Sequence, residues 1–258
     1  MASNPGKFNF TGAGVTATES AGVVTVNVPG GVSKSYVSGL ELTYVSASSV
    51  SIGTGKCRNS DNTFDIVVTS APTSSLAASG ANGLDTGAEA TNTWYAVHII
   101  ADSTAVNSPV GLFSLSATAP SLPAGYDKFR RIGWVRNNSL SDIISFWCNG
   151  NNTQRHYDYT DSITNRAVLL AGAAAAWTLV NAALFIAPTS REGHFQVRQN
   201  GTVSLLIGRD SGTTLIGILA GNEFSTDIPV TSAQAIHYIN FGAGGSADIW
   251  VQGYDDNI

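Results

Sequence analysis

The sequence predicts an all-β fold: a short N-terminal hairpin segment followed by two β-sandwich-type units, the C-terminal one jelly-roll-like. One observation is that short alternating apolar and polar runs recur along the chain, separated by turn residues such as Gly, Asn, Asp and Pro. Another is that charged residues make up 12% of the chain, about half of the roughly 25% usual in soluble proteins, while hydrophobic residues make up 43%. Such a composition favours many short strands joined by tight turns.

Length and charge narrow the organisation and the partners. A chain of 258 residues can bury a core in one large or two modest domains. We expect an N-terminal attachment segment at 1–32, a central β domain at 33–160 and a C-terminal β-sandwich at 161–258. The net charge of −5 argues against nucleic acid as a partner. The sequence lacks a run of about twenty apolar residues and a secretory signal pattern, so we expect neither membrane insertion nor secretion.

The N-terminal segment has the pattern of a small hairpin. Residues 15–18 and 23–28 alternate on either side of Ser20-Ala21-Gly22. A two-stranded ribbon is marginal alone, so this one needs a neighbour. A neighbouring subunit, a docking surface on another protein and the edge of the following domain all stay open.

In the central part the sequence predicts eight strands and one long loop. Residues 94–100 are apolar on both faces and indicate a central strand, in which His98 is expected to be a hydrogen-bonded core or interface residue. Residues 70–92 are rich in Ser, Ala and Gly and predict a loop. Residues 154–160 predict an exposed strand that links the two halves. The other expected strands are 40–45, 50–56, 64–68, 110–115, 132–136 and 143–147.

The C-terminal part predicts about eight short strands, at 177–180, 183–187, 193–198, 203–209, 214–218, 224–230, 236–241 and 248–252. Turns are expected at Asn200-Gly201, at Asp210-Ser211-Gly212 and at 242–245. Eight strands at this spacing favour a two-sheet sandwich of jelly-roll type. The small residues at 171–176 predict a strand or connector where backbones approach closely.

The main concentration of charge lies in residues 120–147, because four of the thirteen basic residues fall between Lys128 and Arg136. The run LPAGYDKFRRIGWVRNN (122–138) follows the strand-like run TWYAVHIIAD (93–102). Together they resemble a recurrent module of tailed-bacteriophage virion proteins, those called tail fibre or head fibre. The resemblance covers most of the chain, and its motifs are structural rather than catalytic.

The resemblance implies a non-enzymatic virion structural protein made in the host cytoplasm. Its expected form is a homotrimeric fibre or spike protein, attached to other virion proteins through its N-terminal segment and involved in host-surface attachment. Low charge and strands apolar on both faces also suit subunits that bury surface against copies of themselves. The alternatives are a capsid-decorating head fibre or cement protein without a receptor, and a free carbohydrate-binding module. A depolymerase, the third class, requires a carboxylate pair that the sequence does not show clearly.

Lys128, Arg130, Arg131 and Arg136 form a basic cluster with two interpretations. One is contact with an anion or polysaccharide. The other, which we favour, is a structural belt at a subunit interface, where arginines satisfy carbonyls or acids. Strand alternation would send Arg131 to one face and Arg136 to the other.

Motifs for catalysis or cofactor binding are missing from the sequence. The chain has no Gly-x-x-x-x-Gly-Lys-Ser/Thr, His-Glu-x-x-His, Cys-x-x-Cys or Gly-x-Ser-x-Gly pattern. The four histidines stand alone without ligand spacing, so we expect no metal, cofactor or catalytic residue. Cys57 and Cys148 predict two partly buried thiols, with a cross-strand disulfide as the alternative.

A host-surface glycan, if the C-terminal sandwich binds one, would contact its loops, because loops carry binding while sheets supply rigidity. The loops 188–194, 209–213 and 221–224 supply the candidates, which are Arg191, Glu192, His194, Arg209, Asp210, Asn222 and Glu223. The alternative is that these loops only pack against neighbouring virion proteins.

Overall fold

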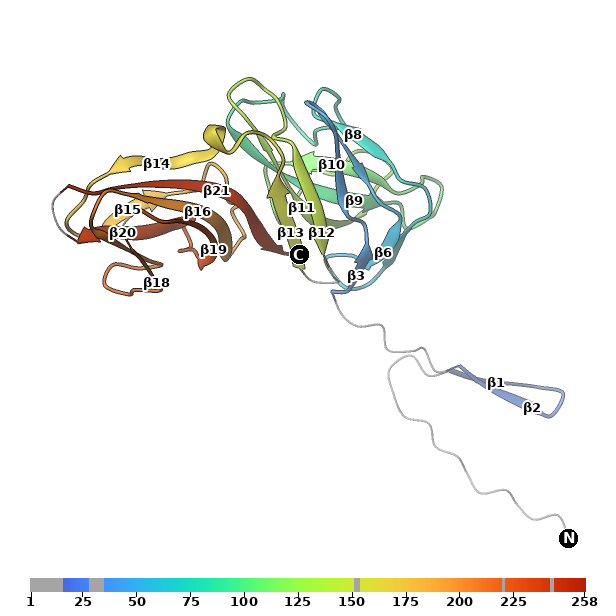
Figure 1. Cartoon of the computed structure of the whole chain (residues 1–258). Coiled ribbons are helices and arrows are strands. Elements are labelled where there is room, and N and C mark those ends of the chain that lie inside the picture. Colours follow the sequence, from blue (N-terminus) through green and yellow to red (C-terminus); the bar gives the residue numbers. More distant parts are fainter. Residues whose placement is uncertain (1–15, 28–34, 151–153, 220, 242–243) are drawn as a thin grey trace, which may run out of the picture.

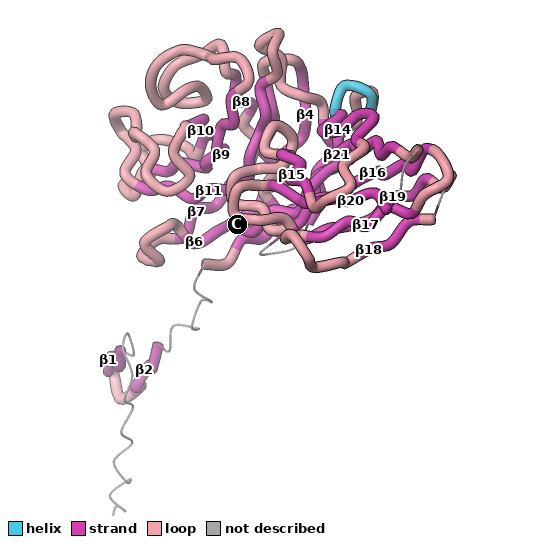
Figure 2. Tube along the Cα trace, turned by 90° about the vertical axis from the view of Figure 1, so that its left-hand side faces the viewer, coloured by secondary structure: helices cyan, strands magenta, loops and turns pink. Residues whose placement is uncertain are grey.

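The fold is all-β, as the sequence predicts. A computed structural model describes residues 16–27, 35–150, 154–219, 221–241 and 244–258. Within these ranges the strands form six antiparallel sheets, and the helical content is one short 3₁₀ turn, η1 (Ile163–Arg166). Figures 1 and 2 show two β units side by side, with the N-terminal hairpin set apart from both. No helix of the described residues is long and apolar enough to cross a membrane.

The hairpin predicted near the N-terminus is present. β1 (Thr16–Ser20) pairs with β2 (Val23–Asn27), and Ala21 and Gly22 make the turn with φ angles of 52° and 77°. Positive φ at both turn residues gives a twist that matches the two strands. Val23 and Val24 are 65% and 61% exposed. Residues 15 and 28 of the predicted strands lie outside the described residues.

The central unit contains three small sheets. β9 (Thr93–Ala101) lies between β10 (Val110–Ser114) and β11 (Lys128–Asn137), which confirms the predicted central strand. The predicted strand at 50–56 is broken into β5 (Ser49–Ile52) and β6 (Gly55–Arg58), and the predicted loop at 70–92 contributes β8 (Thr73–Ser75). The other two sheets have the orders β3 (Val37–Gly39)–β6–β7 (Asp65–Val68) and β4 (Leu42–Ser46)–β5–β8.

His98 lies in the middle of β9 and is fully buried. Its Nε2–H donates to the Ser116 carbonyl at 3.0 Å. Burial lowers the pKa of this histidine to about 4. His98 is therefore a neutral, hydrogen-bonded core residue, as predicted.

The C-terminal unit is a jelly roll. One sheet has the order β14–β21–β16–β19 and the other the order β15–β20–β17–β18. If the eight strands of this unit are numbered along the chain, the first sheet has the order 1-8-3-6. This is the strand order that two Greek keys produce in a jelly roll. The predicted jelly roll is confirmed. Its strands are β14 (Ala167–Gly172), β15 (Thr178–Asn181), β16 (Glu192–Asn200), β17 (Ser204–Gly208), β18 (Ile216–Ile218), β19 (Glu223–Pro229), β20 (Ala235–Phe241) and β21 (Ser246–Asn257).

The prediction of a strand at 183–187 is wrong. These residues form a turn, in which the amides of Phe185 and Ile186 donate to the Ala182 carbonyl at 2.9 and 3.0 Å. The segment is apolar because Ile186 and Ala187 are buried, so the turn itself packs into the core. The strand that completes the jelly roll is β14 instead.

β21 joins the two units. β14 pairs with its residues 247–250 and β16 with its residues 246–255. Residues 253–257 pair with β13 (Gln154–Tyr159), whose other neighbour is β12 (Phe146–Gly150). In Figure 1, β21 extends from the jelly roll towards β12 and β13. The strand predicted at 154–160 therefore links the halves, but it is paired on both edges and alternate side chains are buried.

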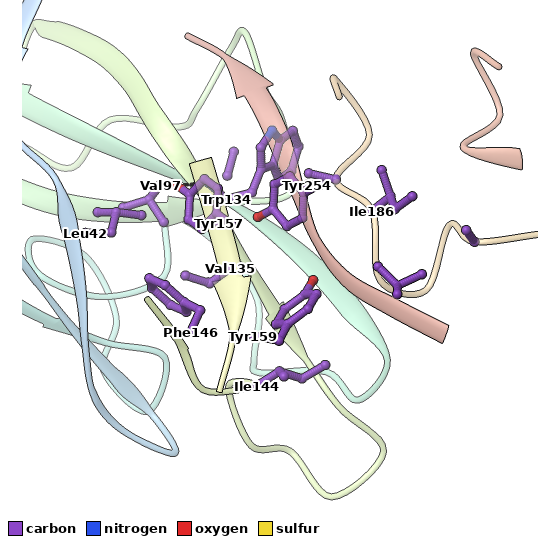
Figure 3. Close-up of a cluster of buried hydrophobic side chains, with 14 of the residues drawn as sticks. Leu42, Val97, Trp134, Val135, Ile144, Phe146, Tyr157, Tyr159, Ile186 and Tyr254 are labelled. Atoms are coloured by element: carbon purple, nitrogen blue, oxygen red, sulfur yellow. Dashed lines mark hydrogen bonds between the residues drawn. The ribbon is translucent and has the colours of Figure 1, made fainter. Parts of the chain in front are cut away.

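Aromatic side chains fill the junction between the two units. Tyr157 and Tyr254 stack with ring centroids 4.7 Å apart, and Trp94 meets Tyr254 and Trp134 edge-on at 5.6 and 6.4 Å. Figure 3 shows Trp134, Tyr157 and Tyr254 packed together. Each such pair adds about 0.5–1.5 kcal/mol beyond the area that it buries. One hydrophobic core therefore runs through both units.

Candidate functional site

A β-bulge in β11 sets the direction of the basic cluster. The register with β9 shifts between Arg131, which pairs with His98, and Gly133, which pairs with Val97. The extra residue turns Arg131 to the face that carries Trp134 and Arg136, because a bulge reverses the alternation beyond it. The Arg131 guanidinium accordingly lies 5.7 Å from the Trp134 ring centroid. The predicted alternation, which sent Arg131 and Arg136 to opposite faces, is wrong.

Arg131 reaches across to the last strand of the jelly roll. Its Nη1 lies 2.5 Å from Asp256 Oδ2, and the Thr189 hydroxyl donates to the other oxygen of Asp256 at 2.5 Å. Burial raises the pKa of the Asp256 carboxyl and outweighs the lowering by Arg131. Because removing this carboxylate from water is costly, the pair fixes the register between the units more than it adds stability.

Side chains of the central unit hold the turn at 183–187 by its backbone. Trp94 Nε1, Arg136 Nε and the Tyr159 hydroxyl donate to the carbonyls of residues 183, 184 and 185, at 2.8, 2.7 and 2.7 Å. Three successive backbone carbonyls of the jelly roll thus accept hydrogen bonds from side chains of the central unit. Arg136 is therefore part of the contact between the units.

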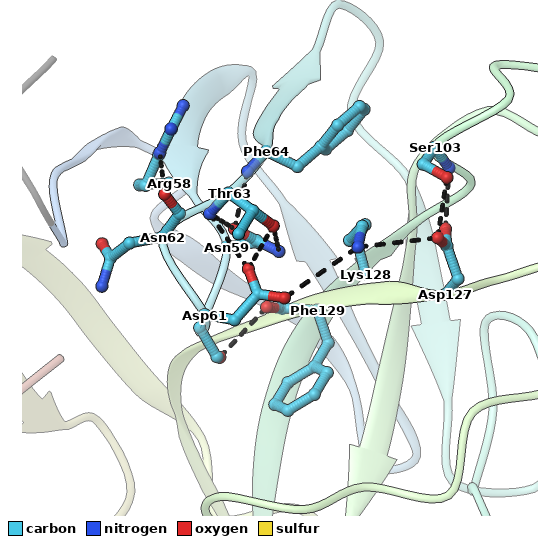
Figure 4. Close-up of polar contacts among 11 residues, drawn as sticks. Arg58, Asn59, Asp61, Asn62, Thr63, Phe64, Ser103, Asp127, Lys128 and Phe129 are labelled. Atoms are coloured by element: carbon cyan, nitrogen blue, oxygen red, sulfur yellow. Dashed lines mark hydrogen bonds and ion pairs between the residues drawn. The ribbon is translucent and has the colours of Figure 1, made fainter. Parts of the chain in front are cut away.

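The other two members of the basic cluster, Lys128 and Arg130, make their contacts within the central unit. Lys128 Nζ lies 3.9 Å from Asp61 Oδ2 and 3.7 Å from Asp127 Oδ2 (Figure 4). Arg130 Nη2 donates to the Ser35 carbonyl at 3.4 Å. All four basic residues thus have partners in their own chain, and a role in a subunit interface stays a prediction.

The residues predicted to contact a glycan are dispersed over the jelly roll. Arg191 directly precedes β16, and Glu192, at the start of β16, pairs with Asp255 near the central unit. Glu223 lies beside the other end of β16, where it pairs with Arg198. Six residues of strand separate these ends by about 20 Å. A short glycan cannot contact both.

The secondary structure of these candidates also differs from the prediction. Glu192 and His194 belong to β16, so the predicted loop 188–194 ends at Arg191, and His194 is 6% exposed. Glu223 begins β19, and its carboxylate accepts a hydrogen bond from the Gln196 side chain. The remaining candidates lie in exposed loops, as predicted; these are Arg191, Arg209, Asp210 and Asn222.

The structure brings two histidines and two aspartates together on one face of the sheet that joins the units. His156 and Asp158 lie two residues apart on β13, and His156 pairs with Asp255 of β21. Gly253 of β21 pairs with Asp158 on one side and with His194 of β16 on the other. A Cβ at Gly253 would lie 3.0 Å from His194 Nδ1, so the glycine leaves room for the imidazole. We call these four side chains the His–Asp cluster.

The two imidazole rings stack, and each meets both carboxylates. The ring centroids of His156 and His194 are 4.4 Å apart with an interplanar angle of 26°. Asp255 Oδ1 lies 2.8 Å from His156 Nδ1 and 3.4 Å from His194 Nε2. Asp158 lies 3.2 Å from His156 Nε2 and 3.8 Å from His194 Nδ1. Burial lowers the pKa of His156, but Asp255 and Asp158 outweigh it and the net shift is upward.

Sequence reasoning missed the His–Asp cluster, and the interpretation that the histidines stand alone is wrong for His156 and His194. The contact between His156 and Asp255 spans 99 residues. The alternation of His156 and Asp158 on one strand was a usable signal, since both must face the same side. The local pattern does not show that β13 pairs with β21, and this pairing is what brings Asp255 to His156.

The sheet β15–β20–β17–β18 turns an apolar face outward, which we call the outer face. Its four strands contain no Lys, Arg, Asp or Glu. Leu179 and Phe241 are 55% and 57% exposed on this face, and Leu206 and Ile239 are half-buried. Leu215 and Leu219, on either side of β18, are also exposed. The opposite face of the same sheet packs into the core.

Comparison with known proteins gives no family. No family model matches the chain, and no curated protein matches it. A solved structure of the T13 IBDV viral particle is similar to this chain at 13% sequence identity, over 88% of this chain and 70% of that chain, with a TM-score of 0.13. A TM-score of this size carries no argument about fold or function.

Proposed function

We propose that the chain is a non-enzymatic structural protein of a tailed-bacteriophage virion, a homotrimeric fibre or spike protein involved in host-surface attachment. The observation that carries the proposal is the outer face. A solvent-facing sheet surface without charge gains free energy when it is buried, and the cores of subunit interfaces are depleted of charge in the same way. Copies of the chain around one axis supply the surface that covers it.

The resemblance to phage fibre modules supports the same proposal. The two runs that carry it, 93–102 and 122–138, contain β9 and β11, which are hydrogen-bonded neighbours in one sheet. The resembling residues thus form one structural unit with a buried central strand. This supports a scaffold role, and the expectation of three copies comes from the resemblance.

Attachment through residues 1–32 completes the proposal. The described part of this segment is the hairpin β1–β2, which stands apart from both units in Figure 1 and exposes Val23 and Val24. A two-stranded ribbon with exposed apolar side chains gains stability when it packs on another protein. Another virion protein is the proposed partner.

A capsid-decorating protein without a receptor is the second candidate. The dispersal of the candidate glycan contacts favours it, because Arg191 and Glu223 lie about 20 Å apart along β16. Adding the purified protein to host cells before infection separates the two roles. A receptor binder should block adsorption, and replacing Arg191 and Arg209 together by Ala should relieve the block. No competition at saturating protein favours decoration.

Light scattering during size-exclusion chromatography tests the trimer. Three copies of the 26.8 kDa chain should elute as a particle of about 80 kDa. Replacing Leu179 and Phe241 together by Asp should shift the mass towards that of one chain, because charge would enter the buried interface. Ser225→Asp, at an exposed position of β19 in the other sheet, is the matched control and should leave the mass unchanged. A monodisperse wild-type monomer at micromolar concentration would contradict the proposal.

Particle experiments test the virion assignment. Electron microscopy of phage labelled with antibody against this chain should show the label on the tail or the capsid. Deleting residues 1–32 should leave a folded protein that no longer enters particles. Full incorporation of the truncated protein would refute the attachment role, and unlabelled particles would refute the virion assignment.

A further inference from the structure

We infer that the His–Asp cluster is a site for a divalent transition-metal ion, Zn²⁺ in the first place, bound by His156 Nδ1, His194 Nε2 and Asp255 Oδ1. The cluster offers two imidazole nitrogens and one carboxylate oxygen from three different strands, and the three atoms lie within 4.8 Å of one another. Imidazole and carboxylate together suit zinc, whereas Mg²⁺ and Ca²⁺ prefer ligand sets made of oxygen.

The spacing of the donor atoms fits a small ion. With bonds of about 2.0–2.2 Å, two ligand atoms of a tetrahedral zinc site lie about 3.4 Å apart. Asp255 Oδ1 lies 2.8 Å from His156 Nδ1 and 3.4 Å from His194 Nε2. Both nitrogens therefore lie near the same carboxylate oxygen. The two imidazole nitrogens lie within 4.8 Å of each other, so an ion between them would draw them together by at most about 1.4 Å.

A second layer of side chains is already in place around the donors. Asp158 Oδ2 lies 3.2 Å from Nε2 of His156 and can accept its N–H, and Asp158 Oδ1 lies 3.8 Å from Nδ1 of His194. Gln154 Nε2 donates to Asp255 Oδ2 at 3.0 Å, which leaves Oδ1 for the metal. A carboxylate behind a metal-bound imidazole fixes the tautomer and the ring orientation. This support distinguishes the cluster from a chance meeting of surface side chains.

The cluster is buried on the side of the sheet and open to solvent on the other side. The side chain of His194 is 8% exposed and that of Asp255 is 20% exposed, while that of His156 is 40% exposed. The ion would therefore be held from the sheet side, with water completing its coordination on the open side. Binding would join β13 of the central unit to β16 of the jelly roll across β21, and so would stabilise the junction between the units. The inference does not depend on the place of the chain in a virion.

Isothermal titration calorimetry of the full-length chain tests the site. The protein is purified without a histidine tag and stripped with a chelator, and ZnCl₂ is titrated into it. We expect saturable binding of one Zn²⁺ per chain and a rise in the unfolding temperature. His194→Gln and Asp255→Asn should each weaken binding by at least about tenfold, and Asp158→Asn by about 10–100-fold. His237→Gln, on the outer face and bonded to the Arg209 carbonyl, is the control and should bind like the wild type.

Two further measurements keep the test decisive where a variant folds poorly. Circular dichroism identifies such a variant, and Co²⁺ added to the stripped wild type then reports the ligands through its visible absorption. The strong bands of a four- or five-coordinate ion support the site. Three results would overturn the inference: no saturable binding of Zn²⁺, equal loss in the His237→Gln control, or only the weak octahedral spectrum of aqueous Co²⁺.

Discussion

Arg131 and Asp256 form an ion pair between β11 of the central unit and β21 of the jelly roll, with Nη1 2.5 Å from Oδ2. The Asp256 side chain is fully buried and that of Arg131 is 13% exposed. A buried carboxylate without its cation is far less stable than one in water. The geometry therefore couples the two units, because neither can move relative to the other without exposing or isolating this carboxylate.

Loss of the Arg131 guanidinium should destabilise the chain strongly. We expect Arg131→Ala to lower the free energy of unfolding by about 3–5 kcal/mol, the usual cost of removing one partner of a buried pair. Urea denaturation followed by tryptophan fluorescence measures it. Lys128→Ala on the same strand is the matched control, since the exposed pair with Asp61 at 3.9 Å should contribute at most about 1 kcal/mol. Equal losses in the two variants would show that burial of the pair is unimportant.

The sequence was informative where structure is local. Alternation and turn residues located the Ala21-Gly22 hairpin, the central strand β9 and the jelly roll, because strand period and turn chemistry are properties of neighbouring residues. The bulge at Arg131 is different, since one extra residue leaves no mark in the alternation of a strand. The turn at 183–187 has an apolar sequence typical of a strand, because Ile186 and Ala187 are buried while side chains of the central unit donate to its carbonyls.

The candidate site was hidden for a related reason. The His–Asp cluster depends on β21 lying between β13 and β16, and β13 meets β21 across 99 residues at His156 and Asp255. Each histidine alone looks like a solitary strand residue. The outer face is likewise not predictable from the sequence. Its strands are free of charge, but only the strand order shows that they form one sheet.

Gly253 should not tolerate a side chain. A Cβ at this position would collide with the Tyr157 carbonyl of the neighbouring strand and press on His194 Nδ1 at 3.0 Å. We expect Gly253→Ala to cost about 1–3 kcal/mol through overpacking, since backbone cannot move aside as a flexible side chain can. Gly217→Ala is the control, because its Cβ would meet only the Leu206 side chain, at 3.3 Å. Thermal unfolding of both variants tests this, and a Gly253→Ala protein as stable as the control would be a contradiction.

The two cysteines should be unreactive in the native protein. Both are free thiols, and burial raises the pKa of Cys57 to about 12 and that of Cys148 to about 11. At pH 8 the thiolate fractions are then about 10⁻⁴ and 10⁻³, and the thiolate is the reactive form. We expect no fast reaction with a disulfide reagent such as DTNB in buffer, and two reactive thiols per chain in urea. One rapidly reacting thiol without urea would show that a cysteine is accessible, and none in urea would show a disulfide.

Asp102 should titrate well below an ordinary aspartate. The Thr104 hydroxyl and amide donate to its Oδ1 at 2.6 and 2.8 Å, and the Asn107 amide and side chain donate to its Oδ2, both at 3.1 Å. These donors stabilise the carboxylate and lower the pKa of Asp102 from 3.8 to about 2, with the Thr104 hydroxyl as the largest cause. A lowered pKa in the folded state means that the contribution to stability is complete above pH 3.8 and is lost as the pH falls through about 2.

The carboxyl ¹³C shift of Asp102, followed by NMR between pH 5 and pH 1.5, measures this directly. Thr104→Val removes the largest donor with little change of shape and should move the midpoint upward. Asn107→Ala should move it less, because its two hydrogen bonds are longer than those of Thr104. A midpoint unaffected by Thr104→Val, or a larger effect of Asn107→Ala, would mean that the hydroxyl does not control the ionisation of Asp102.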